Sequence, residues 1–197
     1  MTTWIVLRAG GVGAFLMLFG AVSWGLISTT SLISTRIAKA TSILIHQVLG
    51  SVGLALLAIH IGGVLVDRFV RFGLLDVLVP LHSHALNVAV SFGVMAMYAT
   101  VVVLVTSWAR KGVGPTLWRR AHLLAAPAFT LAVVHGMLAG TDTTRPWMWW
   151  TYIATGLIVV FLLIVRGLTR GARSATRRPA RRDGEPSRQP VGSASAS

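Results

Sequence analysis

The stretch SILIHQVLGSVGLALLAIHIGGVLV, residues 42–66, decides how the chain can fold. It contains no Asp, Glu, Lys or Arg, and it exceeds the roughly 20 apolar residues that a helix needs to cross a bilayer. Its ionisable side chains are His46 and His60. Ionisable residues are costly inside a membrane and are functional by default. The stretch therefore predicts a membrane-spanning helix whose two histidines have a function.

Four more apolar runs of similar length flank this stretch, and none of them contains Asp or Glu. The seven tryptophans lie within a few residues of the ends of the runs, where Trp favours the membrane interface. The sequence therefore predicts an all-α, polytopic membrane helical bundle with five transmembrane helices. The predicted spans are Trp4–Ile27, Ser42–Val66, Ala85–Trp108, Leu117–Leu138 and Trp147–Val165.

The composition supports a membrane protein and excludes several other classes. Hydrophobic residues make up 54% of the 197 residues and charged residues 12%, about half the share of charge in soluble domains. So apolar a chain is not typical of disordered proteins or of soluble nucleic-acid binders, and we expect no nucleic-acid partner. Because the sequence has no cysteine, disulfides, zinc–cysteine sites, iron–sulfur clusters and covalently attached c-type haem are excluded.

The distribution of basic residues predicts the orientation of the spans. Of the 18 Lys and Arg, four lie on the side of the N-terminus and fourteen on the other side, which the positive-inside rule assigns to the cytoplasm. We expect a multi-pass protein of the plasma membrane with its N-terminus outside. Residues 1–170 form the predicted transmembrane domain, and residues 171–197 a disordered basic cytoplasmic tail. The four basic residues on the side of the N-terminus are Arg8, Arg68, Arg71 and Arg145.

Four histidines occur as two pairs in spans that run in the same direction. His46 and His60 lie 14 residues apart in the second span, and His122 and His135 lie 13 residues apart in the fourth. At 1.5 Å per residue these separations are about 21 and 20 Å, so His46 matches His122 in depth and His60 matches His135. On an ideal helix the separation of 14 residues places His60 within about 40° of the face of His46. The separation of 13 residues places His135 about 140° away from the face of His122. Pro127, between His122 and His135, predicts a kink that re-registers the helix.

These matched pairs fit two non-covalent b-type haems. Neutral imidazole ligates haem iron, and bis-histidine ligation takes one donor from each face of the porphyrin. We therefore expect an inner haem held by His46 and His122 and an outer haem held by His60 and His135. Small residues beside the histidines would let a flat macrocycle approach the backbone, although they also serve helix packing. These small residues are Gly50, Gly53, Ala125 and Ala126.

Basic residues lie where the haem propionates would be. Arg119 precedes His122 at the inner boundary, and Arg8 enters the first span at the depth of the outer site. Because Arg binds carboxylates bidentately, we expect Arg8 and Arg119 to contact the cofactor. Snorkelling to lipid phosphates explains the inner residues equally well, but explains Arg8 less well because of its depth. The inner boundary also carries Arg36, Lys39 and Arg120.

The histidine spacing resembles that of the ferric reductase-like transmembrane domain, which is shared by ferric reductases, NADPH oxidases and the haem-binding subunit of bacterial methionine-sulfoxide repair. Residues Thr106–Arg110, Trp118–His122 and His135–Asp142 are similar to small actinobacterial members. The resemblance covers about residues 4–168 and implies a bundle whose two haems carry electrons across the membrane. Larger members add a flavin and nicotinamide domain, whereas this chain has no G-x-G-x-x-G and no room for such a domain after the last span.

The expected function is that of a ferric reductase-like oxidoreductase subunit. A separate cytoplasmic flavoprotein or membrane quinol would supply electrons, and ferric iron or an extracytoplasmic flavoprotein would accept them. One alternative is a proton or metal transporter with a histidine relay, which the absence of Asp and Glu from the spans disfavours. Another is a structural membrane protein whose histidines hydrogen-bond between helices. His82 and His84, in the outer loop, are too few to make a metal site on spacing alone.

Overall fold

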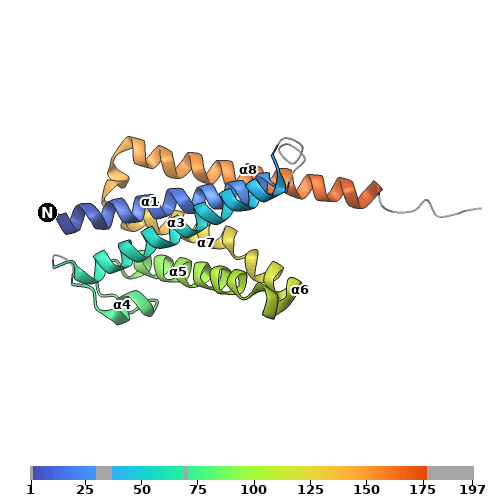
Figure 1. Cartoon of the computed structure of the whole chain (residues 1–197). Helices are drawn as coiled ribbons and strands as arrows, with labels where there is room; N and C mark the ends of the chain where they lie inside the picture. Colours follow the sequence, from blue (N-terminus) through green and yellow to red (C-terminus); the bar gives the residue numbers. More distant parts are fainter. Residues whose placement is uncertain (1, 30–36, 69–70, 177–197) are drawn as a thin grey trace, which may run out of the picture.

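The computed structural model describes residues 2–29, 37–68 and 71–176, and within these ranges it is helical with no strands. Long helices run side by side along the molecule, and short elements connect them at its two ends (Figure 1). The elements are α1 (Thr2–Ile27), α3 (Lys39–Val66), α4 (Leu74–Leu78), α5 (Asn87–Trp108), α6 (Arg110–His122), α7 (Ala125–Ala139), the 3₁₀ helix η1 (Thr141–Thr144) and α8 (Pro146–Thr176).

The helices confirm an all-α bundle of membrane-spanning helices. Among the described residues, α1, α3, α5 and α8 are each long and apolar enough to cross a bilayer. The combined α6 and α7 pass the same test as a fifth span that is bent by 44°. The protein is thus a multi-pass membrane protein. The fourth predicted span, Leu117–Leu138, thus consists of two helices joined at a bend.

The bend lies before Pro127 rather than at it. α6 ends at His122, α7 begins at Ala125, and Pro127 occupies the first turn of α7. A proline ring inside a helix clashes with the carbonyl of the residue four positions earlier, which here is Leu123. The helix therefore stops at this residue, and the N–H of Leu123 bonds to Arg120 O, three residues back. Pro127 can then occupy a first turn, where proline is tolerated.

The last helix is longer than the sequence predicts. α8 continues to Thr176, whereas the predicted span ends at Val165 and the predicted disordered tail begins at residue 171. Residues 171–176 are therefore helical, and the rest of the predicted tail, 177–197, lies outside the described residues.

The bundle is held together on one side by aromatic packing. Phe15 of α1 stacks on Phe129 of α7, with ring centroids 5.7 Å apart, and Tyr152 of α8 meets Phe15 edge-on at 5.0 Å. Gly136 makes room for Tyr152, because a Cβ there would lie 2.5 Å from the phenol oxygen. Aromatic pairs of this geometry stabilise a fold beyond the area they bury. They join α1, α7 and α8 into a packed unit.

The opposite side of the bundle is open. α3 packs mainly along α1 and α5 packs mainly along α7, so the helices form two pairs that touch through α1 and α7. Within its most apolar stretch α3 has 6% of its residues buried, against 28% in α1 and in α8. Both histidine-bearing spans, α3 and the bent α6–α7, face the space between the two pairs.

Candidate functional site

A cavity of about 1600 Å³ fills the space between the two helix pairs. Pockets for drug-sized ligands measure roughly 300–1,000 Å³, so this cavity is large enough for more than one such molecule. His46, His60, His122 and His135 all line it, together with a majority of apolar residues. We call the end that holds His60 and His135 the Arg8 end, and the end that holds His46 and His122 the Arg119 end.

The histidines face one another in the pairs that their depth in the sequence predicts. The ring centroids of His46 and His122 are 5.8 Å apart, and those of His60 and His135 are 6.4 Å apart. Two imidazoles that bind one metal ion from opposite sides have centres about 6 Å apart, given metal–nitrogen bonds of about 2 Å. Each pair is therefore spaced to hold a single metal ion between its rings.

Hydrogen bonds to backbone carbonyls orient three of the four rings. Nδ1 of His46 lies 3.0 Å from Ala21 O and Nδ1 of His60 lies 3.0 Å from Leu7 O, both on α1. Nδ1 of His135 lies 2.8 Å from Ala89 O on α5. A carbonyl can only accept, so each Nδ1 carries the proton and donates it, and each Nε2 is left with a lone pair. The second nitrogen of each ring, Nε2, takes no part in these bonds, and all three rings line the cavity.

Glycines allow the rings to lie this close to the neighbouring helices. A Cβ on Gly11 would lie 2.8 Å from His60 Nδ1, and a Cβ on Gly93 would lie 2.8 Å from the His135 ring. A Cβ on Gly25 would lie 3.3 Å from His46 Cε1. Sequence reasoning missed these three residues. Each of these glycines lies in one apolar span at the same depth as a histidine in another span, and this match is the sequence pattern that could have identified them. The pattern is not sufficient, because the sequence does not show which helices are neighbours.

The small residues singled out from the sequence have different roles. Gly50 lines the cavity, and a Cβ at this position would meet open space. The backbone is therefore accessible to a flat group at this point. Gly53 also lines the cavity but packs against α1, since its Cβ would lie 3.0 Å from Met17 Cβ. Ala125 and Ala126 also line the cavity.

His122 differs from the other three histidines in its partner. Its Nδ1 lies 3.4 Å from Ser107 Oγ of α5, a long contact to a hydroxyl instead of a short one to a carbonyl. Trp118 donates its indole N–H to the same Ser107 Oγ at 3.3 Å and packs its ring 5.3 Å from that of His122. The guanidinium of Arg110 lies over the Trp118 ring at 5.3 Å. Ser107 and Trp118 were not identified from the sequence as residues of the site.

Arg8 lies on the cavity wall, and its charge is matched by an acidic partner. Its Nε donates to Asp142 Oδ2 at 2.9 Å, and Nη2 contacts the other carboxylate oxygen. The Arg8 and Asp142 side chains are 38% and 19% exposed. The Arg8 guanidinium also lies over the Trp4 ring at 5.4 Å. The pair ties α1 to η1, a contact across 134 residues that the sequence did not predict.

Basic side chains surround the cavity at the Arg119 end. Arg119 lines the cavity, and its Nε donates to Pro115 O at 3.0 Å, which fixes the side chain against α6. The acidic residues among the described cavity-lining residues, Asp67 and Asp142, both belong to the Arg8 end. The predicted Arg36 lies outside the described residues. The other basic residues that line this end are Lys39, Arg110, Arg120, Arg166 and Arg170.

The donor set suits a planar group that brings its own ligands. Within residues 2–29, 37–68 and 71–176 there is no cluster of three or more His, Cys, Asp or Glu that could hold a bare metal ion. A haem iron already has four porphyrin nitrogens and needs only two axial imidazoles, and each histidine pair supplies two. The apolar walls, the open space beside Gly50 and the basic residues at the Arg119 end fit a porphyrin with its propionates.

The loop residues His82 and His84 lie apart from the cavity. They follow α4, and neither lines the cavity between the helix pairs.

Comparisons of the chain with protein-family models, with curated proteins and with solved structures find no match.

Proposed function

We propose that this chain is a membrane-embedded, di-haem b electron-transfer protein. The observation that carries the proposal is the two facing histidine pairs, whose ring centroids are 5.8 and 6.4 Å apart across one cavity, with Nδ1 of three of the four rings bonded to backbone carbonyls. When bound, two haems would pass single electrons between the two ends of the cavity.

The residues of the chain would hold and tune these groups. His46 and His122 would hold the haem at the Arg119 end, and His60 and His135 would hold the haem at the Arg8 end. In metal sites the second ring nitrogen of a ligating histidine usually donates to a carbonyl or carboxylate, which fixes the tautomer and makes the ligand more basic. The carbonyls of α1 and α5 supply this support for three of the four rings.

The distribution of charge supports an orientation for the proposed electron transfer. Basic residues at the Arg119 end suit the cytoplasmic side under the positive-inside rule, which places the Arg8 end outside the plasma membrane. A cytoplasmic flavoprotein or a membrane quinol would then donate electrons at the Arg119 end. Ferric iron or an extracytoplasmic flavoprotein would accept them at the Arg8 end.

One observation also favours a purely structural role for the histidines. The bonds from His46 and His60 to α1, and from His135 to α5, join neighbouring helices, which is what interhelical histidines do in haem-free proteins. These bonds use Nδ1 alone, and a structural role does not require a second histidine across the cavity. A transporter is disfavoured because the predicted spans contain no Asp or Glu for a proton relay.

Optical spectroscopy tests the proposal directly. The full chain, purified with haem supplied during expression, is expected to bind two haems per chain and to show b-type bands in the reduced-minus-oxidised spectrum. His46→Ala and His60→Ala should each lower the haem content from two to one. Val48→Ala, which changes a residue of the same helix that does not line the cavity, is the matched control and should leave two. A preparation without b-type bands, or histidine variants that keep both haems, would reject the proposal.

A further inference from the structure

The loop between α3 and α5 carries two histidines that are open to solvent. His82 is 42% exposed at its side chain, and His84 is also exposed. Their ring centroids are 6.1 Å apart, with the rings inclined by 57°. Because one residue separates them in a loop, rotation of the exposed His84 side chain can bring both Nε2 atoms to one ion.

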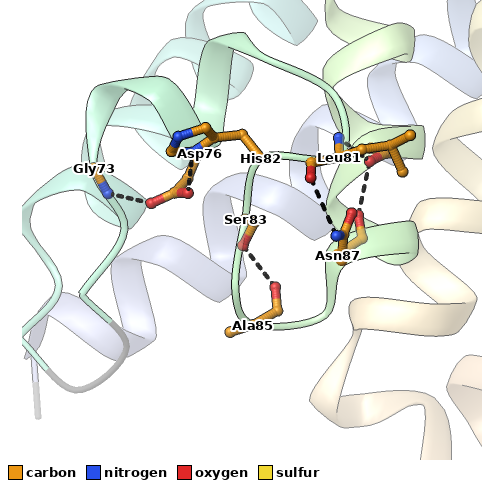
Figure 2. A network of polar contacts seen from close by, with 8 residues as sticks. Gly73, Asp76, Leu81, His82, Ser83, Ala85 and Asn87 are labelled. Atoms are coloured by element: carbon orange, nitrogen blue, oxygen red, sulfur yellow. Dashed lines mark hydrogen bonds and ion pairs between the residues drawn. The ribbon is translucent and has the colours of Figure 1, made fainter.

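A carboxylate holds the first of these histidines in place. The Nδ1 of His82 lies 2.9 Å from Asp76 Oδ1, and Asp76 Oδ2 accepts the N–H of Gly73 at 2.7 Å (Figure 2). The Asp76 side chain is only 13% exposed, so it belongs to the framework of the loop. A carboxylate that accepts from one ring nitrogen directs the other nitrogen of the histidine outward as a ligand, the arrangement common in histidine metal sites.

The rest of the loop is fixed by hydrogen bonds around a strained backbone. Leu81 donates its N–H to Ser91 Oγ at 2.7 Å, and Asn87 Nδ2 donates to Leu81 O at 3.1 Å (Figure 2). Leu81 and Leu86, which bracket the two histidines, adopt positive φ angles of 64° and 51°. Such strain persists where surrounding contacts enforce it, and it is concentrated at ligand-binding and active sites. The loop therefore presents both imidazoles from a defined backbone.

We propose that His82 and His84 bind a divalent first-row transition-metal ion, with Cu²⁺ bound most tightly, and that Asp76 is the positioning residue. Imidazole nitrogens suit copper, zinc and nickel, and affinity along this series peaks at Cu²⁺. Two protein nitrogens leave the remaining coordination positions to water, so the site is open to solvent. Calcium and magnesium prefer oxygen ligands and do not suit this pair. The inference rests on the loop alone and does not depend on the proposed function.

Copper titration of the full chain in detergent, followed by electron paramagnetic resonance, tests the site. The expected spectrum contains a Cu²⁺ species with two coordinated nitrogens that the His82→Asn and His84→Asn variants both lose. The intramembrane histidines contribute equally to all variants, so the difference between spectra reports the loop. Asp76→Asn should weaken binding about 10–100-fold, as loss of a carboxylate partner of a ligating histidine typically does.

Asp67→Asn is the matched control for Asp76→Asn. It removes the same charge from the segment between α3 and α5 without removing a partner of His82, so Cu²⁺ affinity should be unchanged. Circular dichroism shows whether each variant remains helical, and His84→Gln offers a second substitution at an exposed position if His82→Asn fails to fold. Copper spectra identical in the wild type and the folded histidine variants overturn the site. Equal weakening by both Asp variants overturns the positioning role of Asp76.

Discussion

The two ends of the cavity support their histidines in different ways. At the Arg8 end, His60 and His135 both donate to backbone carbonyls at 3.0 Å or less, and the arginine is neutralised by Asp142. At the Arg119 end, His46 has a carbonyl partner, but His122 has a hydroxyl at 3.4 Å. Six basic residues and no acidic one line that end within the described residues.

This difference separates an end whose charge is balanced within the chain from an end with an excess of positive charge. The Arg8 end satisfies its own charge, and close backbone contacts fix its rings. The Arg119 end has an excess of positive charge and a ring held by side chains. We therefore expect substitutions at the Arg8 end to act mainly through packing, and those at the Arg119 end mainly through electronic effects on the bound group.

The largest expected effect comes from crowding a ring at the Arg8 end. Gly93→Val should displace His135, because even a Cβ at this position would lie 2.8 Å from the ring. The haem content should fall from two per chain to one, as measured by pyridine haemochrome assay. Gly62→Val is the control, since a Cβ on Gly62 meets nothing within 4 Å. A Gly93→Val protein with two haems and unchanged spectra would contradict the packing role of Gly93.

Loss of the ion pair should have the next largest effect. Arg8→Leu leaves Asp142 without its partner in a partly buried position, and we expect unfolding in mixed micelles to become easier by about 1–2 kcal/mol. Replacing both residues, as Arg8→Leu with Asp142→Leu, should restore most of this loss, because no unpaired charge remains. A double variant as unstable as the sum of the two single variants would show that the two residues do not stabilise each other.

A smaller effect is expected at the Arg119 end. If His122 holds a haem, Ser107 would accept the proton of its Nδ1, so Ser107→Ala would make the imidazole a weaker electron donor. The potential of one haem should rise by at most about 59 mV, a tenfold change in a one-electron equilibrium, with the other haem unchanged. Thr106→Val is the control, because the Thr106 hydroxyl bonds within α5. Redox titration in which Ser107→Ala shifts both haems equally would refute a local effect.

The smallest effect concerns acid sensitivity outside the membrane. The Gly73 N–H, followed by the His82 side chain, lowers the pKa of the Asp76 carboxyl below its usual 3.8. Because the pKa of Asp76 is lower in the folded loop than in the unfolded chain, its ionised carboxylate stabilises the fold. This stabilisation is complete at a pH above the pKa of the unfolded chain, and it is lost as the pH falls through the pKa of the folded loop. Proteolysis of the loop should therefore increase below about pH 3.8 with an acid-stable protease, and Asp76→Asn should show the increase already at neutral pH. Loop cleavage independent of pH in the wild type would contradict this.

The spans and the matching of histidine depths follow from the sequence, because both depend on distances along a helix. The apolar run around His46 and His60 needs a bilayer, and a fixed rise per residue sets the depths. The partners of the rings do not follow. α1 and α5 are apolar on almost every side, so no pattern shows that Gly11 faces His60 or that Gly93 faces His135. The contact between Arg8 and Asp142 depends on how distant helices meet, and local periodicity contains no information about it.

The break before Pro127 determines how the spacing between His122 and His135 should be interpreted. On a straight helix His122 and His135 would point in directions about 140° apart, and one of them would face lipid. The helix is interrupted at Leu123 and Leu124 and bent by 44°, and both histidines line one cavity. The spacing of 13 residues therefore serves one cavity in a helix that is interrupted between the two histidines. A search for distant relatives should therefore accept variable histidine spacing in the fourth span when a proline lies about one turn after the first histidine.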